Sequence, residues 1–175
     1  LTLPDDYRLF LKEIGNGGAG PFYGLLPLED NEDQRTTPNT AFGFTAENPC
    51  LLEKYDAYDE KIDNAKTDEE EQALWDLKEF LLDADYEKAT NGITFLCHEG
   101  CCMFSVLILK GAERGTVWWF NFSDQVGVVP IVLEKQQVSF LDWYEMWLDA
   151  SLDSVKNGTK AFSTYGQFVG LDNIV

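Results

Sequence analysis

Metal-ligating and nucleophilic side chains gather at one place in the sequence, Cys97-His98-Glu99-Gly100-Cys101-Cys102. A tetrahedral zinc site usually takes its ligands from two separated pairs of Cys or His, and outside this cluster the chain offers only Cys50. On extended backbone Cys97 and His98 would point to opposite faces, which disfavours a thiolate–imidazole pair. We therefore expect no metal, no cofactor and no catalytic residue, and reduced cysteines that pack as small apolar side chains.

The glycine-rich segment Gly15-Asn16-Gly17-Gly18-Ala19-Gly20-Pro21 is a second candidate, for phosphate binding. It lacks the Gly-Lys-Ser/Thr ending of a phosphate loop, and it follows a helical pattern where the dinucleotide fingerprint follows a strand. We interpret it as a helix stop and a tight turn. His98 is the sole histidine, and the carboxylates are too numerous for spacing to select an acid–base pair. The sequence therefore predicts that the protein is not an enzyme.

Charge limits the class of partner. The chain has 13 Lys and Arg residues against 31 Asp and Glu residues, a net charge of -18. Nucleic acid and anionic membranes would be repelled at long range, whereas a basic protein surface would be attracted. Residues 53–87 hold fourteen acidic and four basic residues, so a net charge of -10 is concentrated there. The alternative is that the acidity only keeps the protein soluble.

Two helical patterns precede the predicted sheet. Pro4 and the acidic pair Asp5 and Asp6 begin the first helix, and Gly15 ends it. Its expected buried face is Tyr7, Phe10, Leu11 and Ile14. Short strands are expected at 22–26 and 41–45. The acidic segment 53–87 is expected to be a helical insertion, with a capping box at Thr67 and Glu70 and a helical repeat of Leu74, Leu77 and Leu81.

From Asn91-Gly92 onward the pattern is that of strands. β-Branched and aromatic runs at 93–96, 101–109, 116–122 and 126–133 are separated by short turns, which predicts an antiparallel meander. The middle runs are apolar on both alternating faces, so we expect cover on both faces or strong curling. Ser139 and Asp142 begin a last helix, expected to extend to Leu152, whose aromatic stripe should pack on the sheet. The stripe is Phe140, Trp143, Tyr144, Trp147 and Leu148.

The sequence predicts one domain, residues 1–175, of α+β class with a curved, mainly antiparallel sheet and flanking helices. Its longest apolar stretches are far shorter than the roughly 20 residues of a membrane span, and its first residues lack the basic start of a signal peptide. We expect a cytoplasmic protein. Trp118, Trp143 and Trp147 are expected in the core, while the patterns leave Trp75 and Trp119 undecided.

Three blocks, in this order and spacing, resemble the SUKH superfamily. They are Leu3-Pro4-Asp5-Asp6-Tyr7 continuing through Ile14-Gly15-Asn16-Gly17-Gly18-Ala19-Gly20-Pro21-Phe22-Tyr23-Gly24-Leu25, then Glu99-Gly100-Cys101, then Gly111 through Gly115-Thr116-Val117-Trp118. The aromatic segment 140–148 is similar to the family's closing helix. The resemblance implies an α+β fold with a curved sheet. It implies a bacterial immunity protein, with fungal interaction modules as relatives, and it carries no catalytic residue over.

Three functions follow as hypotheses. The first is an immunity protein that binds a cognate toxin with a basic surface, for which a nuclease would fit best. The second is a regulatory scaffold or interaction module, and the third is a small-molecule-binding protein or hydrolase that uses the curved sheet as a pocket. For the first, acidic residues of predicted loops and one tryptophan anchor are the expected contacts. They are Glu29, Asp30, Glu32, Asp33, Glu99, Asp124 and Trp119.

Overall fold

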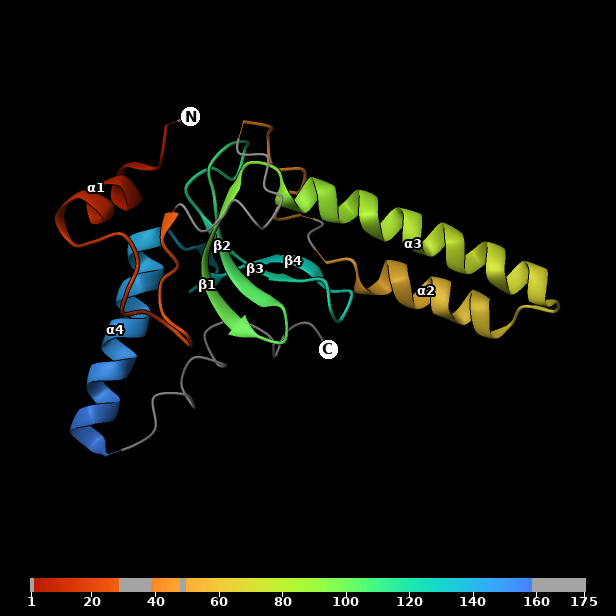
Figure 1. The fold of residues 1–175 in the computed structure, drawn as a ribbon. Coiled ribbons are helices and arrows are strands. Elements are labelled where there is room, and N and C mark those ends of the chain that lie inside the picture. Colours follow the sequence, from red (N-terminus) through yellow and green to blue (C-terminus); the bar gives the residue numbers. More distant parts are fainter. Residues whose placement is uncertain (1, 29–38, 48–49, 159–175) are drawn as a thin grey trace.

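A computed structural model describes residues 2–28, 39–47 and 50–158 (Figure 1). These residues form an α+β structure with four helices. The helices are α1 (Asp5–Glu13), α2 (Leu52–Asp63), α3 (Asp68–Thr90) and α4 (Phe140–Asn157). The strands are β1 (Ile93–Gly100), β2 (Met103–Ile108), β3 (Val117–Asn121), β4 (Gly127–Pro130), β5 (Val132–Leu133) and β6 (Gln136–Gln137). In the described part of the chain, every helix is too short or too polar to cross a lipid bilayer.

The main sheet is the predicted antiparallel meander, with strand order β1-β2-β3-β4. The last predicted run, 126–133, is divided into β4 and β5 at Ile131, whose N–H donates to the carbonyl of Val117 and whose carbonyl accepts from the N–H of Val138. After this division β5 and β6 form a small separate hairpin that the sequence pattern did not predict. The coarse fold class is therefore confirmed.

Apolar side chains cover both faces of the sheet, as predicted. Trp118 and Trp119 are neighbours on β3 and belong to different core clusters, because alternate residues of a strand point to opposite faces. Trp119 shares its cluster with Phe10 of α1 and Trp143 of α4, so these two helices cover one face. Trp118 shares its cluster with Phe42, and with Ala89 at the end of α3.

The first and last helices lie close to their predicted bounds. In α4 the capping box of Ser139 and Asp142 is present, and the helix continues beyond Leu152 until Gly158 adopts the left-handed conformation that ends it. The prediction that Ile14 belongs to the buried face of α1 is wrong. Ile14 is the C-terminal cap, and its side chain is 72% exposed because the chain leaves the helix there.

Neither predicted N-terminal strand is present, which corrects the sequence interpretation of 22–26 and 41–45. Leu25 makes only isolated bridges to Gly18 and Cys97. Phe42 fills the core from an irregular segment, whose backbone donates one hydrogen bond to Lys110. In the glycine-rich segment, Gly17 and Gly18 have φ values of +93° and +112°, and a Cβ on Gly17 would lie 3.1 Å from Pro27. The glycines therefore permit a tight turn, as predicted.

Candidate partner-binding surface

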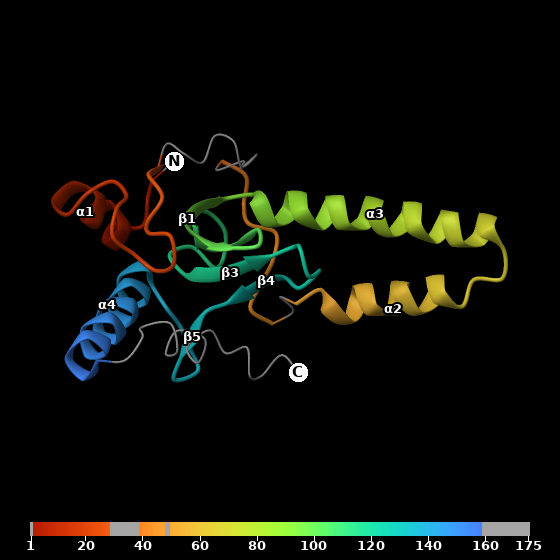
Figure 2. The same cartoon turned by 60° about the horizontal axis from the view of Figure 1, so that its bottom comes forward.

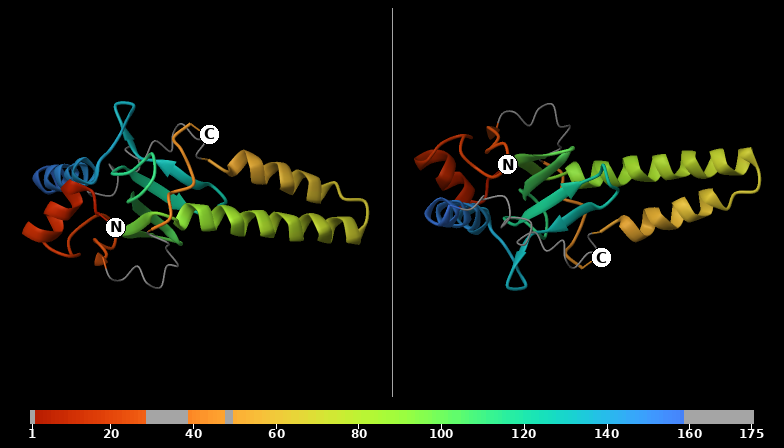
Figure 3. Two further views of the ribbon diagram at one scale, coloured as in Figure 1. Left: turned by 90° about the horizontal axis from the view of Figure 1, so that it is seen from above. Right: turned by 90° about the horizontal axis from the view of Figure 1, so that it is seen from below.

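Helices α2 and α3 form an antiparallel hairpin that extends away from the sheet (Figure 2). The views from above and below show that α1 and α4 lie on the other side of the sheet (Figure 3). The hairpin contains the acidic segment 53–87, so the net charge of -10 is presented on a projecting element. The sequence predicted a helical segment here, and the structure corrects it to two helices that are joined at 64–67.

The junction of the two helices explains this correction. Thr67 accepts a hydrogen bond at its side chain from the backbone N–H of Glu70, which begins α3 as predicted. The returning half of the expected capping box is absent, because the Glu70 carboxylate accepts from the N–H of Lys66 and not from that of Thr67. Asn64 caps the end of α2 and Thr67 has an extended conformation, so the chain turns between them and α2 and α3 pack against each other.

A buried carboxylate fixes the base of the hairpin. Asp85 of α3 accepts hydrogen bonds from the Tyr55 hydroxyl at 2.8 Å, from Lys88 at 3.0 Å and from Lys54. Burial alone would raise the pKa of Asp85, but the hydrogen bonds from Lys54, Tyr55 and Lys88 outweigh it and lower the pKa. Asp85 is therefore ionised at neutral pH and joins α2 to α3 where the hairpin leaves the sheet.

Farther along the hairpin, a second ion pair joins the helices. Lys78 of α3 is almost fully buried and pairs with Asp59 of α2. Other apolar side chains of α3 are much less covered, since Trp75 is 46%, Leu77 44% and Phe80 68% exposed. The outer part of the hairpin thus combines acidic side chains with several exposed apolar ones. Isolated exposed apolar residues are common on protein surfaces, but a group of them on one element is not.

The carboxyl of Glu99 lies in a different environment. It is partly buried on β1, where its two oxygens accept hydrogen bonds from the Ser105 hydroxyl and, at 3.1 Å, from the Trp119 indole N–H. Burial raises the pKa of Glu99 to about 7, although these hydrogen bonds act in the opposite direction. Burial likewise raises the pKa of the neighbouring Cys97 thiol to about 12, so this thiol is neutral and a poor nucleophile.

Glu99 should make the stability of the protein fall as pH rises from about 4.5 to about 7. The unfolded carboxyl loses its proton near the ordinary pKa of 4.5, whereas the folded one retains it to about 7. The folded state binds this proton more tightly, so ionisation across the interval removes stability, on the order of 3 kcal/mol at most. Asp85 has the opposite sign, but its contribution is lost only on acidification below this interval.

Urea unfolding at pH 5 and pH 8 measures this effect. Glu99→Gln is neutral at both pH values, so the difference between its two free energies of unfolding should be smaller than in the parent protein. Glu145→Gln, an exposed change on α4, serves as the control and should leave the difference within about 0.5 kcal/mol of the parent value. Equal pH dependence in the parent and in Glu99→Gln would show that Glu99 does not titrate in this range.

Of the seven predicted contact residues, the structure describes Glu99, Asp124 and Trp119. Glu29, Asp30, Glu32 and Asp33 lie outside the described residues. Asp124 is exposed in the turn between β3 and β4, as expected, where it hydrogen-bonds Asn121. The loop placement of Glu99 is wrong, because Glu99 belongs to β1. Trp119 is only 7% exposed and packs in the core, so the structure offers no exposed ring there as a partner anchor.

The cysteine cluster is divided between core and surface. Cys97 is buried in β1, whereas Cys101 and Cys102 are exposed in the turn that leads to β2. The His98 ring packs against Tyr23 and Phe104. Among the residues that the structure describes, no three His, Cys, Asp or Glu side chains are placed to hold a metal ion. The expectation that the protein folds without a metal stays a prediction.

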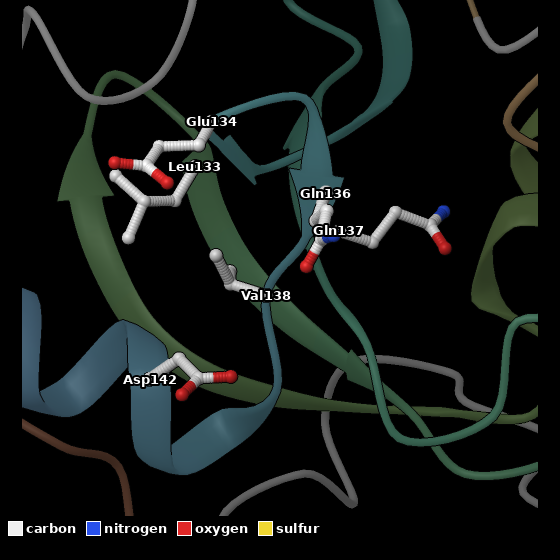
Figure 4. Close-up of a pocket in the computed structure, with 6 residues that line it drawn as sticks. All are labelled: Leu133, Glu134, Gln136, Gln137, Val138 and Asp142. Carbon is white, nitrogen blue, oxygen red and sulfur yellow. The ribbon is translucent and has the colours of Figure 1, made fainter.

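Two surface hollows bear on small-molecule binding. The first, of about 230 Å³, lies between the β5–β6 hairpin and the start of α4 (Figure 4). Its side chains come from separate elements, and Asp142 is already engaged in capping α4. The second, of about 280 Å³, lies beside Trp75 and Gln125. Both are smaller than the roughly 300–1,000 Å³ of typical ligand sites.

No family model, curated protein or solved structure matches this chain. Of the features described above, the α2–α3 hairpin is the candidate site, because it alone combines concentrated charge, projection from the sheet and exposed apolar side chains. Sequence reasoning located its acidity. The exposure of Leu77, one of the three leucines of the predicted helical repeat, was not predicted.

Proposed function

We propose that this chain is an immunity protein of the SUKH type. It binds a protein toxin that has a basic surface, uses the α2–α3 hairpin as the main contact and blocks the toxin in a stoichiometric complex, in the cytoplasm. The observation that carries the proposal is the hairpin, which projects away from the sheet and whose residues 53–87 have a net charge of -10. The three sequence segments that resemble the SUKH superfamily support this family, and the α+β structure is compatible with the fold that the family implies.

Electrostatics supports a basic partner. A concentrated negative surface attracts a positively charged protein over a distance of about 8 Å at physiological ionic strength, and it raises the rate of productive encounter. Charge alone gives little affinity, because exposed ion pairs contribute roughly 0.2–1 kcal/mol each. The exposed side chains of Leu77 and Phe80 supply apolar area that a bound partner would bury. The hairpin therefore offers both steering and contact area.

A non-enzymatic regulatory scaffold is the second candidate, since the same surface would serve it. The immunity function and the scaffold function differ in the partner that is bound and not in the chemistry of the surface. A gene for a large secreted toxin directly beside this one favours immunity, and its absence favours the scaffold. The small-molecule or hydrolase hypothesis is less well supported, because the buried thiol of Cys97 is neutral and the Glu99 carboxyl is held by Ser105 and Trp119.

Protection of cells tests the function. Cells that express the toxin domain encoded beside this gene should grow when the full chain is co-expressed, and the two proteins should elute as one complex with a fixed ratio. A toxin domain from an unrelated system should not be neutralised, because specificity depends on the matched surface. Full expression without protection against any neighbouring toxin would contradict the immunity function and favour the scaffold.

A further inference from the structure

A regular apolar stripe runs along the outer side of α3. Ala73, Leu77, Phe80 and Ala84 are spaced alternately four and three residues apart, which places them on one side of the helix. This spacing is that of the a and d positions of a heptad repeat. Leu77 and Phe80 lie at its centre and are 44% and 68% exposed. In the described structure the stripe therefore has the pattern of a helix-packing seam without a helix on it.

The two borders of the stripe differ. In the same heptad register, Glu69, Asp76 and Asp83 fall at successive g positions, so one border is a line of exposed carboxylates. On the other border Leu74 and Leu81 are half-buried and lie nearer the side of α3 that carries Lys78. A helix on the stripe would thus face acidic side chains along one edge and apolar ones along the other.

We propose that this stripe is the docking site for an amphipathic α-helix of the partner, whose apolar face is bordered by Lys or Arg. The proposal rests on the proposed function and names the element of the partner that the hairpin receives. The backbone hydrogen bonds of α3 are satisfied within the helix, so α3 recognises a partner through side chains and not by strand addition. The stripe from residue 73 to residue 84 is about 16 Å long, which suits a partner helix of about three turns.

Charge excludes the other occupants that a bare apolar stripe would admit. A second copy of this chain packed antiparallel would bring another acidic border against the line of Glu69, Asp76 and Asp83, whereas in a parallel pair these carboxylates would face the apolar Leu74 and Leu81. Each molecule also has a net charge of -18. Like charges at such positions oppose pairing, whereas basic residues there select the partner and its orientation. The occupant that fits both the apolar seam and its border is therefore a basic amphipathic helix.

A synthetic peptide tests the docking site with the full chain. The probe has about three heptads, with Leu at a and d and Lys at e and g, so that its own charge prevents self-pairing. In fluorescence anisotropy, Leu77→Gln with Phe80→Gln should weaken its binding at least tenfold. Leu148→Gln with Leu152→Gln, which removes comparable exposed side chains from α4, should change binding less than about twofold. A peptide with Gln in place of Leu should bind at least tenfold more weakly than the probe.

Three results would overturn the docking site: equal binding of the probe by the Leu77/Phe80 variant, equal binding of the peptide that lacks leucine, or a dimer of the chain that this variant dissociates. Circular dichroism checks that the variants remain folded. The outcome is separable from that of the proposed function. Protection without peptide docking would overturn only this site, and docking without protection against any neighbouring toxin would overturn only the immunity function.

Discussion

Replacing Trp143 with alanine is expected to destabilise the protein by about 3–5 kcal/mol, the range for emptying a large aromatic site in a core. The Trp143 side chain is fully buried in the cluster that joins α1, α4 and the sheet. Its ring lies near Phe140 of the same helix, with 6.0 Å between ring centroids. Since small domains are stable by only about 5–15 kcal/mol, this one change would remove a large part of the total.

Trp147→Ala is the matched control, because it removes the same side chain from the next turn of α4. The sequence placed Trp147 in the core, but its side chain is only half-buried, beside Tyr144. The cost should therefore be less than half of that for Trp143. Urea unfolding followed by circular dichroism avoids the loss of a fluorophore. Equal losses in the two variants, or a loss within about 0.5 kcal/mol for Trp143→Ala, would show that α4 does not pack as described.

The sheet and its covering helices were predictable because their signals are local. The β-branched and aromatic runs of the strands and the capping pair Ser139 and Asp142 depend on residues that are close in sequence. The two expected strands near the N-terminus were wrong for the opposite reason. Leu25 and Phe42 are apolar because they fill gaps in the core, and the same local pattern describes a buried irregular segment.

The site was only partly predictable. Charge counting found the acidic segment, but spacing could not show that α2 returns along α3, because the division at 64–67 is set by a turn and a cap. The seam of Ala73, Leu77, Phe80 and Ala84 was present in the sequence as a heptad spacing. The sequence interpretation instead took Leu74, Leu77 and Leu81 as one helical repeat, although Leu77 belongs to the exposed seam. Which side of an isolated helix is covered depends on the partner helix, and a sequence pattern alone does not state it.

Charge removal on the hairpin is expected to slow association with the partner about 10- to 100-fold at low ionic strength. Glu69→Gln, Asp76→Asn and Asp83→Asn together neutralise the acidic border of α3 and preserve the shape of its side chains. The reason is long-range attraction, which raises association rates by such factors and declines as salt shortens the Debye length. The dissociation rate should change much less, because exposed carboxylates contribute little to a formed contact.

The matched control carries the same change of net charge on the far side of the molecule. Glu13→Gln, Glu145→Gln and Asp149→Asn neutralise exposed carboxylates on α1 and α4, across the sheet from the hairpin (Figure 1). This variant should associate within about threefold of the parent rate, because local charge and not total charge guides the encounter. The comparison separates a binding surface from acidity that only keeps the protein soluble.

The most direct test of the role of the hairpin is to measure association kinetics from about 50 to 500 mM salt. The three proteins are the parent and the two variants, and the partner is the toxin domain encoded beside the gene. The parent protein and the α1–α4 variant should associate fast at low salt and slow down steeply as salt rises. The hairpin variant should associate more slowly at low salt, with a shallower salt dependence than the parent protein. Identical rates and salt dependence for all three proteins, or a larger loss in the α1–α4 variant, would contradict binding through the α2–α3 hairpin.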